Sequence, residues 1–274
     1  MLTRVLHVSD LHFGRREDPA AHEALLRLSE RLRPDLVIAS GDLAHRGTRA
    51  QLEAATALLR QLERPVLAVP GNHDIPYSFP ARFTRPWFEF ERLWETTEPV
   101  HRTEALHVVG LNSVRPWRHQ SGRLRDEQLA RAAELFAEAP PGALRVAVLH
   151  HHLLGAPWRS RKKPVARRNL VLARLVESGA ELILAGHIHQ STVAERREFE
   201  VSTPGGERAV IVSIAPGFGQ PRPQRRGEAR GLHLYAAGES ELTVSTFIWR
   251  DDGWGLTAER TFARGRDPLT FEPS

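Results

Sequence analysis

The stretch Val66-Leu67-Ala68-Val69-Pro70-Gly71-Asn72-His73-Asp74 decides how the rest of the chain is interpreted. Its four apolar residues stand between two prolines, which favours a short buried strand over a helix. Asn72, His73 and Asp74 then follow the carboxyl end of that strand, the edge at which open α/β sheets bind ligands. An ordinary Gly-Asn turn with incidental charge is the alternative interpretation. The chemical interpretation is favoured because several other predicted strands end in similar polar groups.

The composition is typical of a globular protein with one full hydrophobic core. With 274 residues, 41% hydrophobic and 26% charged, one large domain is favoured over two. No apolar run approaches the roughly 18 residues of a transmembrane segment, and the first residues show no signal-peptide layout. We therefore expect a cytoplasmic protein. Since the chain has no cysteine, the candidate ligands for a metal are histidine, aspartate, glutamate and asparagine.

The net charge of +5 is concentrated in one short segment, residues 159–168. This basic loop carries six positive charges and no negative one, so it accounts for the whole excess. A polynucleotide partner would favour a basic stripe over an entire face, so nucleic acid is not the favoured substrate. The loop has two interpretations: it binds a second phosphate or a lipid headgroup, or it is simply solvated.

Apolar runs alternate with amphipathic segments over the first two thirds of the chain. Strands are expected over 4–9, 36–39, 66–69, 107–111, 146–149 and 182–185, and helices over 19–33, 126–136 and 170–176, with a further helix between Thr48 and Pro65. This βαβ rhythm predicts parallel sheets covered by helices.

Two further segments have a different pattern. The side chains of Phe83, Trp87, Phe90 and Trp94 recur on one helical face, which predicts a helical cap over about 77–95 that packs into the core. From Thr192 the apolar residues alternate, which predicts a terminal antiparallel sheet with strands over about 192–250. We therefore expect a catalytic domain over 1–250, followed by a peripheral tail over 251–274.

Five of the predicted strand ends carry polar clusters. They are Asp10-x-His12, Gly41-Asp42, Gly71-Asn72-His73-Asp74, His150-His151-His152 and Gly186-His187-x-His189. A lone histidine is usually a structural residue, and an aspartate after a strand is usually a helix cap. Together, however, the clusters predict a cage of oxygen and imidazole ligands along one sheet edge, which suits two first-row divalent ions.

The order and spacing of these motifs resemble the calcineurin-like metallophosphoesterase superfamily over about the first 190 residues. The length and the final hairpins resemble its small bacterial cyclic-nucleotide phosphodiesterase-like branch. The resemblance implies a four-layer α/β sandwich, with two mixed sheets flanked by helices and a dinuclear metal site at the strand carboxyl ends. It implies that one ion is held by Asp10, His12, Asp42 and His189, and the second by Asp42, Asn72, His150 and His187.

The same resemblance suggests roles for the residues beside the metals. His73 resembles the histidine that contacts phosphate and protonates the leaving alkoxide, and Asp74 is expected to orient it. Where the family often has His-His-Pro or His-Gln, this chain has three histidines and then Leu153. We assign His150 as the ligand because it comes first after the strand, and His151 is the alternative.

The expected activity is hydrolysis of small phosphodiesters, with cyclic nucleotides among the candidates. Two ions roughly 3.5–4 Å apart can share a hydroxide that attacks in line, and they can stabilise both reacting oxygens. Manganese, iron, zinc and cobalt all suit such ligands. The alternatives on the same site are a nuclease or a hydrolase of a nucleotide-diphosphate lipid. A non-catalytic metal-binding scaffold is the remaining alternative, which the full set of ligand types disfavours.

Overall fold

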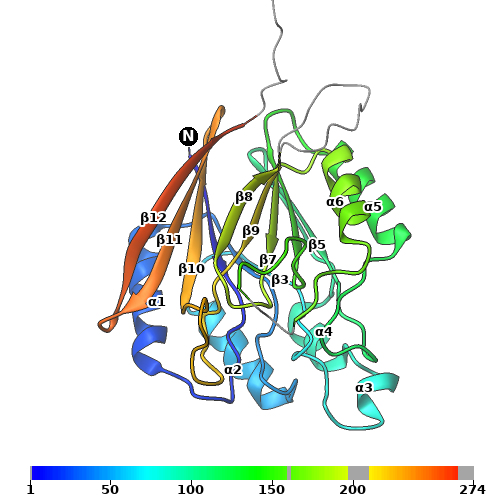
Figure 1. Cartoon of the computed structure of the whole chain (residues 1–274), viewed down its shortest axis with the longest axis vertical. Helices are drawn as coiled ribbons and strands as arrows, with labels where there is room; N and C mark the ends of the chain where they lie inside the picture. The colour runs from blue at the N-terminus through cyan, green and yellow to red at the C-terminus, as the bar shows by residue number, and fades with distance from the viewer. Residues whose placement is uncertain (1, 159–161, 197–209, 265–274) are drawn as a thin grey trace, which may run out of the picture.

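The computed structural model describes residues 2–158, 162–196 and 210–264, and it consists of two six-stranded mixed sheets packed face to face (Figure 1). The first sheet has the order β12 (Gly253–Ala263), β11 (Glu241–Arg250), β10 (Gly231–Ala237), β1 (Thr3–Val8), β2 (Leu36–Ala39) and β3 (Val66–Ala68). The second has the order β4 (Val100–Arg102), β5 (Leu106–Leu111), β6 (Leu144–Leu149), β7 (Leu182–Ala185), β9 (Val210–Ile214) and β8 (Thr192–Arg196).

Helices cover the outer faces of both sheets, as Figure 1 shows. The first sheet packs against α1 (Pro19–Leu32) and α2 (Arg49–Arg60), and the second against α5 (Asp126–Ala137) and α6 (Arg168–Glu177). Along β2 the side chains alternate, so that Val37 packs toward the helices while Leu36 and Ile38 pack toward the other sheet. This confirms the four-layer sandwich. Within the described ranges, no helix has the length and apolar character needed to cross a membrane.

The parallel strands bring their carboxyl ends to one edge of the sandwich. In the first sheet β1, β2 and β3 are parallel, and in the second β5, β6 and β7 are parallel. The loops that follow are joined by backbone bonds, such as Asp10 N to the Gly41 carbonyl at 2.9 Å and Gly186 N to the His150 carbonyl at 3.0 Å. The predicted polar clusters are therefore neighbours in space.

The C-terminal strands do not form a separate antiparallel sheet. Instead β8 and β9 extend the second sheet, while β10, β11 and β12 extend the first, with β10 antiparallel to β1. The segment expected to be a peripheral tail contains β12, whose Trp254 and Phe262 are only 8% and 7% exposed. An alternating pattern of apolar residues indicates a strand but not the strands with which it pairs. The sequence therefore did not reveal that the C-terminal strands join the two main sheets. Residues 265–274 of the expected tail lie outside the described residues.

The aromatic segment forms two short helices, α3 (Ala81–Thr84) and α4 (Phe88–Trp94), in place of one cap helix. Pro86 separates them because it lacks a backbone N–H and disfavours a helical residue before it. Phe90 is fully buried, whereas Phe83 on the same predicted face is 48% exposed. The expected core packing therefore holds for α4 and not for α3.

A buried polar network lies between the two sheets, below the clustered loops. In it, His7 bonds to Ser40 Oγ at 2.8 Å and the Tyr235 hydroxyl donates to Ser213 Oγ at 2.7 Å. Ser213 Oγ is in turn 3.0 Å from Nδ1 of His233. Burial, with the charge of His233 added, lowers the pKa of His7 to about 3, and burial lowers the pKa of His233 to about 3. Both histidines are therefore neutral in the folded protein at neutral pH.

This network predicts an acid-sensitive fold. Because the folded pKa of His233 lies below the unfolded value, the unfolded chain gains the proton first, and stability is lost as the pH falls from about 6.5 toward about 3. The unfolding free energy of the wild-type protein should fall between pH 6 and pH 5. In His233→Asn this fall is expected to be smaller by about 1 kcal/mol. Urea unfolding of metal-saturated protein at both pH values measures this. An unchanged loss would contradict the assignment of a neutral buried histidine.

Candidate metal centre

The first group of residues that could bind a metal ion comes from both sheets. Asp10 and His12 follow β1, and His189 follows β7. Nε2 of His189 lies 3.2 Å from Nε2 of His12 and 3.1 Å from Oδ1 of Asp10. All three side chains are buried, and their ligand atoms lie within 4.8 Å of one another. One cation can therefore contact all three.

The second group lies beside the first and shares a carboxylate with it. Nε2 of His150 is 3.4 Å from Oδ1 of Asp42, 3.2 Å from Oδ1 of Asn72 and 3.1 Å from Nδ1 of His187. The other oxygen of Asp42, Oδ2, is 3.8 Å from Nε2 of His12 in the first group. Asp42 therefore presents one oxygen to each group, as a bridging ligand requires.

The donor atoms in the two groups fit divalent cations. Asp10 and Asp42 are completely buried, yet Oδ1 of Asp10 and Oδ2 of Asp42 have no hydrogen-bond partner. A buried charged oxygen without a partner is strongly unfavourable, so such atoms call for a ligand. The set contains only carboxylate, amide and imidazole donors, which suits manganese, iron, zinc or cobalt.

The ionisation states also suit a metal site. Burial alone would raise the pKa of Asp10, but the charge of His189 outweighs it and keeps the pKa below its ordinary value. Burial lowers the pKa of His12 and that of His187. Burial would also lower the pKa of His150, but the charge and hydrogen bond of Asp42 raise it to about 9. A cation beside Asp42 would displace this proton, because histidine binds metals in its neutral form.

Left-handed backbone conformations aim several of these side chains into the site. Five ligand-type residues have positive φ angles: Asp10 at 55°, His12 at 53°, Asp42 at 53°, His187 at 75° and His189 at 57°. Each such conformation costs roughly 1–2 kcal/mol for a residue with a Cβ, and such outliers cluster at functional sites. Among the described residues, five of the twelve non-glycine residues with positive φ therefore belong to these two groups.

Two glycines allow the loops to approach one another this closely. A Cβ on Gly71 would lie 2.1 Å from the backbone N of Asp42, and one on Gly186 would lie 1.8 Å from Oγ of Ser9. Any side chain at either position would push the strand ends apart.

Among the three consecutive histidines, the structure places His150 in the second group. Its Nδ1 donates to the Ser40 carbonyl at 2.8 Å, which leaves Nε2 facing Asp42. His151 instead bonds through Nδ1 to Oγ of Ser113 at 2.9 Å, and its ring lies against that of His187. His151 therefore packs behind the ligand-type residues.

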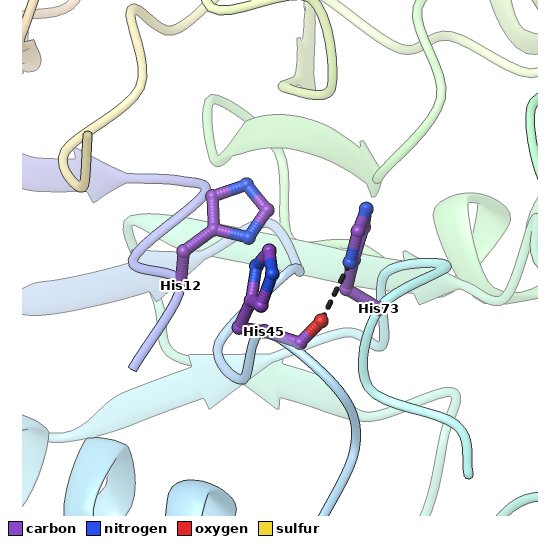
Figure 2. A group of neighbouring side chains, drawn as sticks. All are labelled: His12, His45 and His73. Atoms are coloured by element: carbon purple, nitrogen blue, oxygen red, sulfur yellow. Dashed lines mark hydrogen bonds between the residues drawn. The ribbon is translucent and has the colours of Figure 1, made fainter. Parts of the chain in front are cut away.

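His73 lies at the edge of the site and is held by groups that the motif did not reveal. Its Nδ1 is 2.7 Å from the carbonyl oxygen of His45 and 2.8 Å from the Tyr77 hydroxyl, which is 2.7 Å from Nε2 of His119. Figure 2 shows the imidazoles of His12, His45 and His73 gathered together, with the bond from His73 to the His45 carbonyl. His45 and Tyr77 lie in loops and belong to none of the predicted motifs. The only sequence signal for them is that they follow Asp42 and His73 closely along the chain.

Asp74 does not contact the ring of His73, which differs from the expectation. Its two carboxylate oxygens accept hydrogen bonds from Ala44 N at 2.8 Å and Gly71 N at 2.7 Å. Burial and the nearby charge of Asp42 raise the pKa of Asp74 to about 8. Asp74 therefore joins the loops after β2 and β3, and the His45 carbonyl and Tyr77 take the place expected for it beside His73.

A pocket of about 460 Å³ opens beside the metal-binding groups. It is lined by His12, Arg15, His45, His73, Gln120, Lys162, His189, Pro221, Arg222 and Arg225. Four of these side chains are basic and none is acidic, so the pocket suits an anion. Burial lowers the pKa of one of them, Lys162. Only part of the basic loop is seen, because residues 159–161 lie outside the described residues, but Lys162 donates to the His187 carbonyl.

The two packed sheets therefore present buried aspartate and histidine groups at one edge, in an arrangement that can hold two metal ions. The chain belongs to the calcineurin-like phosphoesterase family, whose model matches residues 3–191. This confirms the class expected from the five motifs.

Comparison with individual proteins gives the same result. The chain is 27% identical over 214 residues to a probable cyclic nucleotide phosphodiesterase of Synechococcus, covering 72% of this chain and 77% of the relative. It is 30% identical over 206 residues to a cAMP/cGMP dual specificity phosphodiesterase of Mycobacterium tuberculosis, covering 69% of this chain and 63% of that one. A purple acid phosphatase from yellow lupin has the same fold, with a TM-score of 0.73 and 14% identity over 96% of this chain and 54% of the plant enzyme.

Proposed function

We propose that this protein hydrolyses small phosphodiesters, with cyclic nucleotides as the first substrates to test. The observation that carries the proposal is the pair of buried groups that share Asp42 and open, beside His73, into a cationic pocket. The bacterial relatives named as cyclic nucleotide phosphodiesterases support the choice of substrate class.

In this proposal, Asp10, His12, Asp42 and His189 hold one divalent ion, and Asp42, Asn72, His150 and His187 hold the other. When bound, the two ions supply a nucleophilic water and stabilise negative charge on the phosphoryl oxygens. Asn72 ligates without adding an anion, so the site keeps its attraction for a phosphate. Arg15, Lys162 and the other pocket cations draw the negatively charged substrate toward that site.

His73 is the proposed general acid. The His45 carbonyl can only accept a hydrogen bond, so Nδ1 of His73 carries the proton in that contact and Nε2 is left for the substrate. A proton on Nε2 can pass to the leaving alkoxide oxygen, which would otherwise depart as a strong base. The His45 carbonyl and the Tyr77 hydroxyl hold the ring in this orientation.

Metal removal tests the proposal directly. Chelator-treated protein is expected to lose hydrolysis of bis(p-nitrophenyl) phosphate and to regain it when manganese is added. It should also unfold at a lower temperature, because ligands at about 100 times their Kd stabilise a fold by about 2.7 kcal/mol. Metal analysis, p-nitrophenolate release and thermal unfolding are the measurements. Full diesterase activity in metal-free protein would contradict the proposal.

A substrate panel separates this function from its alternatives. Cyclic AMP, cyclic GMP, glycerophosphodiesters, a nucleotide-diphosphate lipid and single-stranded DNA are compared by kcat/KM at equal metal loading. Preference for single-stranded DNA or for the lipid would favour the nuclease or the lipid hydrolase instead.

A further inference from the structure

We infer that the pocket beside the metal centre binds a second phosphate of the substrate, so that the substrate is a phosphodiester that also carries a terminal phosphate group. The inference rests on the proposed function and narrows its substrate class. It is drawn from the pocket wall formed by Arg15, Lys162, Arg222 and Arg225, which lies beyond the residues proposed to hold the metals.

The cationic wall comes from three separate loops. Arg15 follows β1, Lys162 follows β6, and Arg222 and Arg225 lie between β9 and β10. The same pocket is lined by His12, His73 and His189 of the candidate centre. A ligand with one phosphate at these histidines can therefore reach the cationic wall with another part of the molecule. The volume of about 460 Å³ is that of a small-molecule site.

The guanidinium groups of Arg15 and Arg225 are not neutralised by the protein. Arg15 donates through Nε to the Pro221 carbonyl at 2.7 Å, which fixes the side chain but leaves its charge uncompensated. Arg225 bonds to Glu228 through its backbone alone: its N–H donates to the Glu228 carboxylate at 3.1 Å and its carbonyl accepts from Glu228 N at 3.0 Å. In the described part of the chain, neither guanidinium has a carboxylate within ion-pair distance. Planar guanidinium groups of this kind match phosphate oxygens well.

The loop that carries Arg222 and Arg225 is held in place before any ligand binds. Arg222 makes a bidentate ion pair with Glu228 at 2.7 and 2.8 Å, and Gln224 donates to the Glu228 carbonyl at 2.6 Å. Arg230, at the end of the same loop, pairs with Asp18 at 2.7 Å. A loop fixed in this way loses little conformational entropy when it binds an anion.

The charge balance favours a substrate with more than one phosphate. Glu228 offsets Arg222, which leaves the charges of Arg15 and Arg225 along the pocket. A cyclic nucleotide carries a single negative charge, and that charge belongs at the metal centre. A terminal phosphate adds close to two negative charges and three acceptor oxygens, which complement the remaining cations.

The test compares two dinucleotides that differ only in a terminal 5′-phosphate, pApA and ApA. For the metal-loaded wild-type protein, kcat/KM for pApA is expected to exceed that for ApA by at least about fivefold at low salt. The ratio should fall as potassium chloride is raised, since salt screens exposed charges. Arg15→Ala and Arg225→Ala should each bring the ratio closer to one, and Arg225→Glu further still.

Arg226→Ala is the matched control, because Arg226 lies on the same loop but stacks over the Trp158 ring at 4.6 Å and does not line the pocket. It should keep the wild-type ratio. Hydrolysis of bis(p-nitrophenyl) phosphate with a pApA to ApA ratio near one would overturn this inference and leave the proposed function standing. An equal fall of the ratio in Arg226→Ala would overturn the assignment to this pocket. Failure to hydrolyse any diester would overturn both proposals.

Discussion

Asp42→Asn is expected to reduce the metal content of the purified protein from two ions per chain to fewer than one. The side chain is completely buried, and each of its oxygens faces a different group of ligand-type residues. The amide keeps the shape but removes the charge that offsets both cations. Because even residues that only support metal ligands contribute about 10–100-fold to activity, diester hydrolysis should fall by more than about 100-fold. Elemental analysis and initial rates measure both effects.

Asp126→Asn is the matched control for this change. Its carboxylate is 70% exposed at the start of α5, where it pairs with Arg167 away from the centre. The control should keep its metal and its activity. Two bound ions in Asp42→Asn would rule out the bridging role, whatever happened to the rate.

His73→Asn is expected to lower turnover of substrates with poor leaving groups by roughly 10²–10⁴-fold, the usual contribution of a general acid. The leaving group of cyclic AMP is an alkoxide that needs a proton, whereas p-nitrophenolate leaves readily without one. The loss should therefore be large for cyclic AMP and much smaller for bis(p-nitrophenyl) phosphate. His73 also forms a cluster of possible metal ligands with His12 and His45, but this cluster is only partly buried and does not include Asp42. Metal content should therefore not change, because His73 lies outside the two buried groups that share Asp42.

Tyr77→Phe separates proton donation from orientation of the ring. This variant removes the 2.8 Å contact to Nδ1 but keeps the bond from His73 to the His45 carbonyl. A smaller loss is expected, with the same dependence on the leaving group. If His73→Asn slowed both substrates equally, binding or positioning would explain the loss better than proton transfer.

The sequence predicted the parallel part of the fold well because two physical signals agreed there. The helix over 19–33 and the strands over 36–39 and 182–185 combine apolar periodicity with clear breaks, and the structure has them at nearly the same bounds. The strands after Thr192 were identified as strands but placed in the wrong sheet arrangement, because alternation carries no information about neighbours. Only the tertiary structure reveals that β10 lies beside β1.

The sequence also located the candidate site, but not its internal contacts. All the residues proposed as ligands lie in the two buried groups, since each follows a strand end on the same edge. The positive φ angles of Asp10 and His187 could not be predicted, because such conformations are imposed by packing. The partner of His73 was misjudged for a similar reason. Asp74 is adjacent in sequence, yet backbone N–H groups satisfy its carboxylate.

The position of β1 between β2 and β10 has a consequence for how the chain folds during synthesis. Residues 3–191 match the family and contain all the proposed metal ligands, yet β1 pairs with β10 through residues more than 200 positions later, as in Thr3 with Ala237. Until Val210–Ile214 and Gly231–Ala237 emerge from the ribosome, one side of β1 and one side of β7 remain unpaired edges. Open strand edges promote aggregation, and such distant pairing slows folding. The C-terminal strands contain none of the proposed metal ligands. Their synthesis nevertheless determines when the part of the chain that contains those ligands is protected from misassembly.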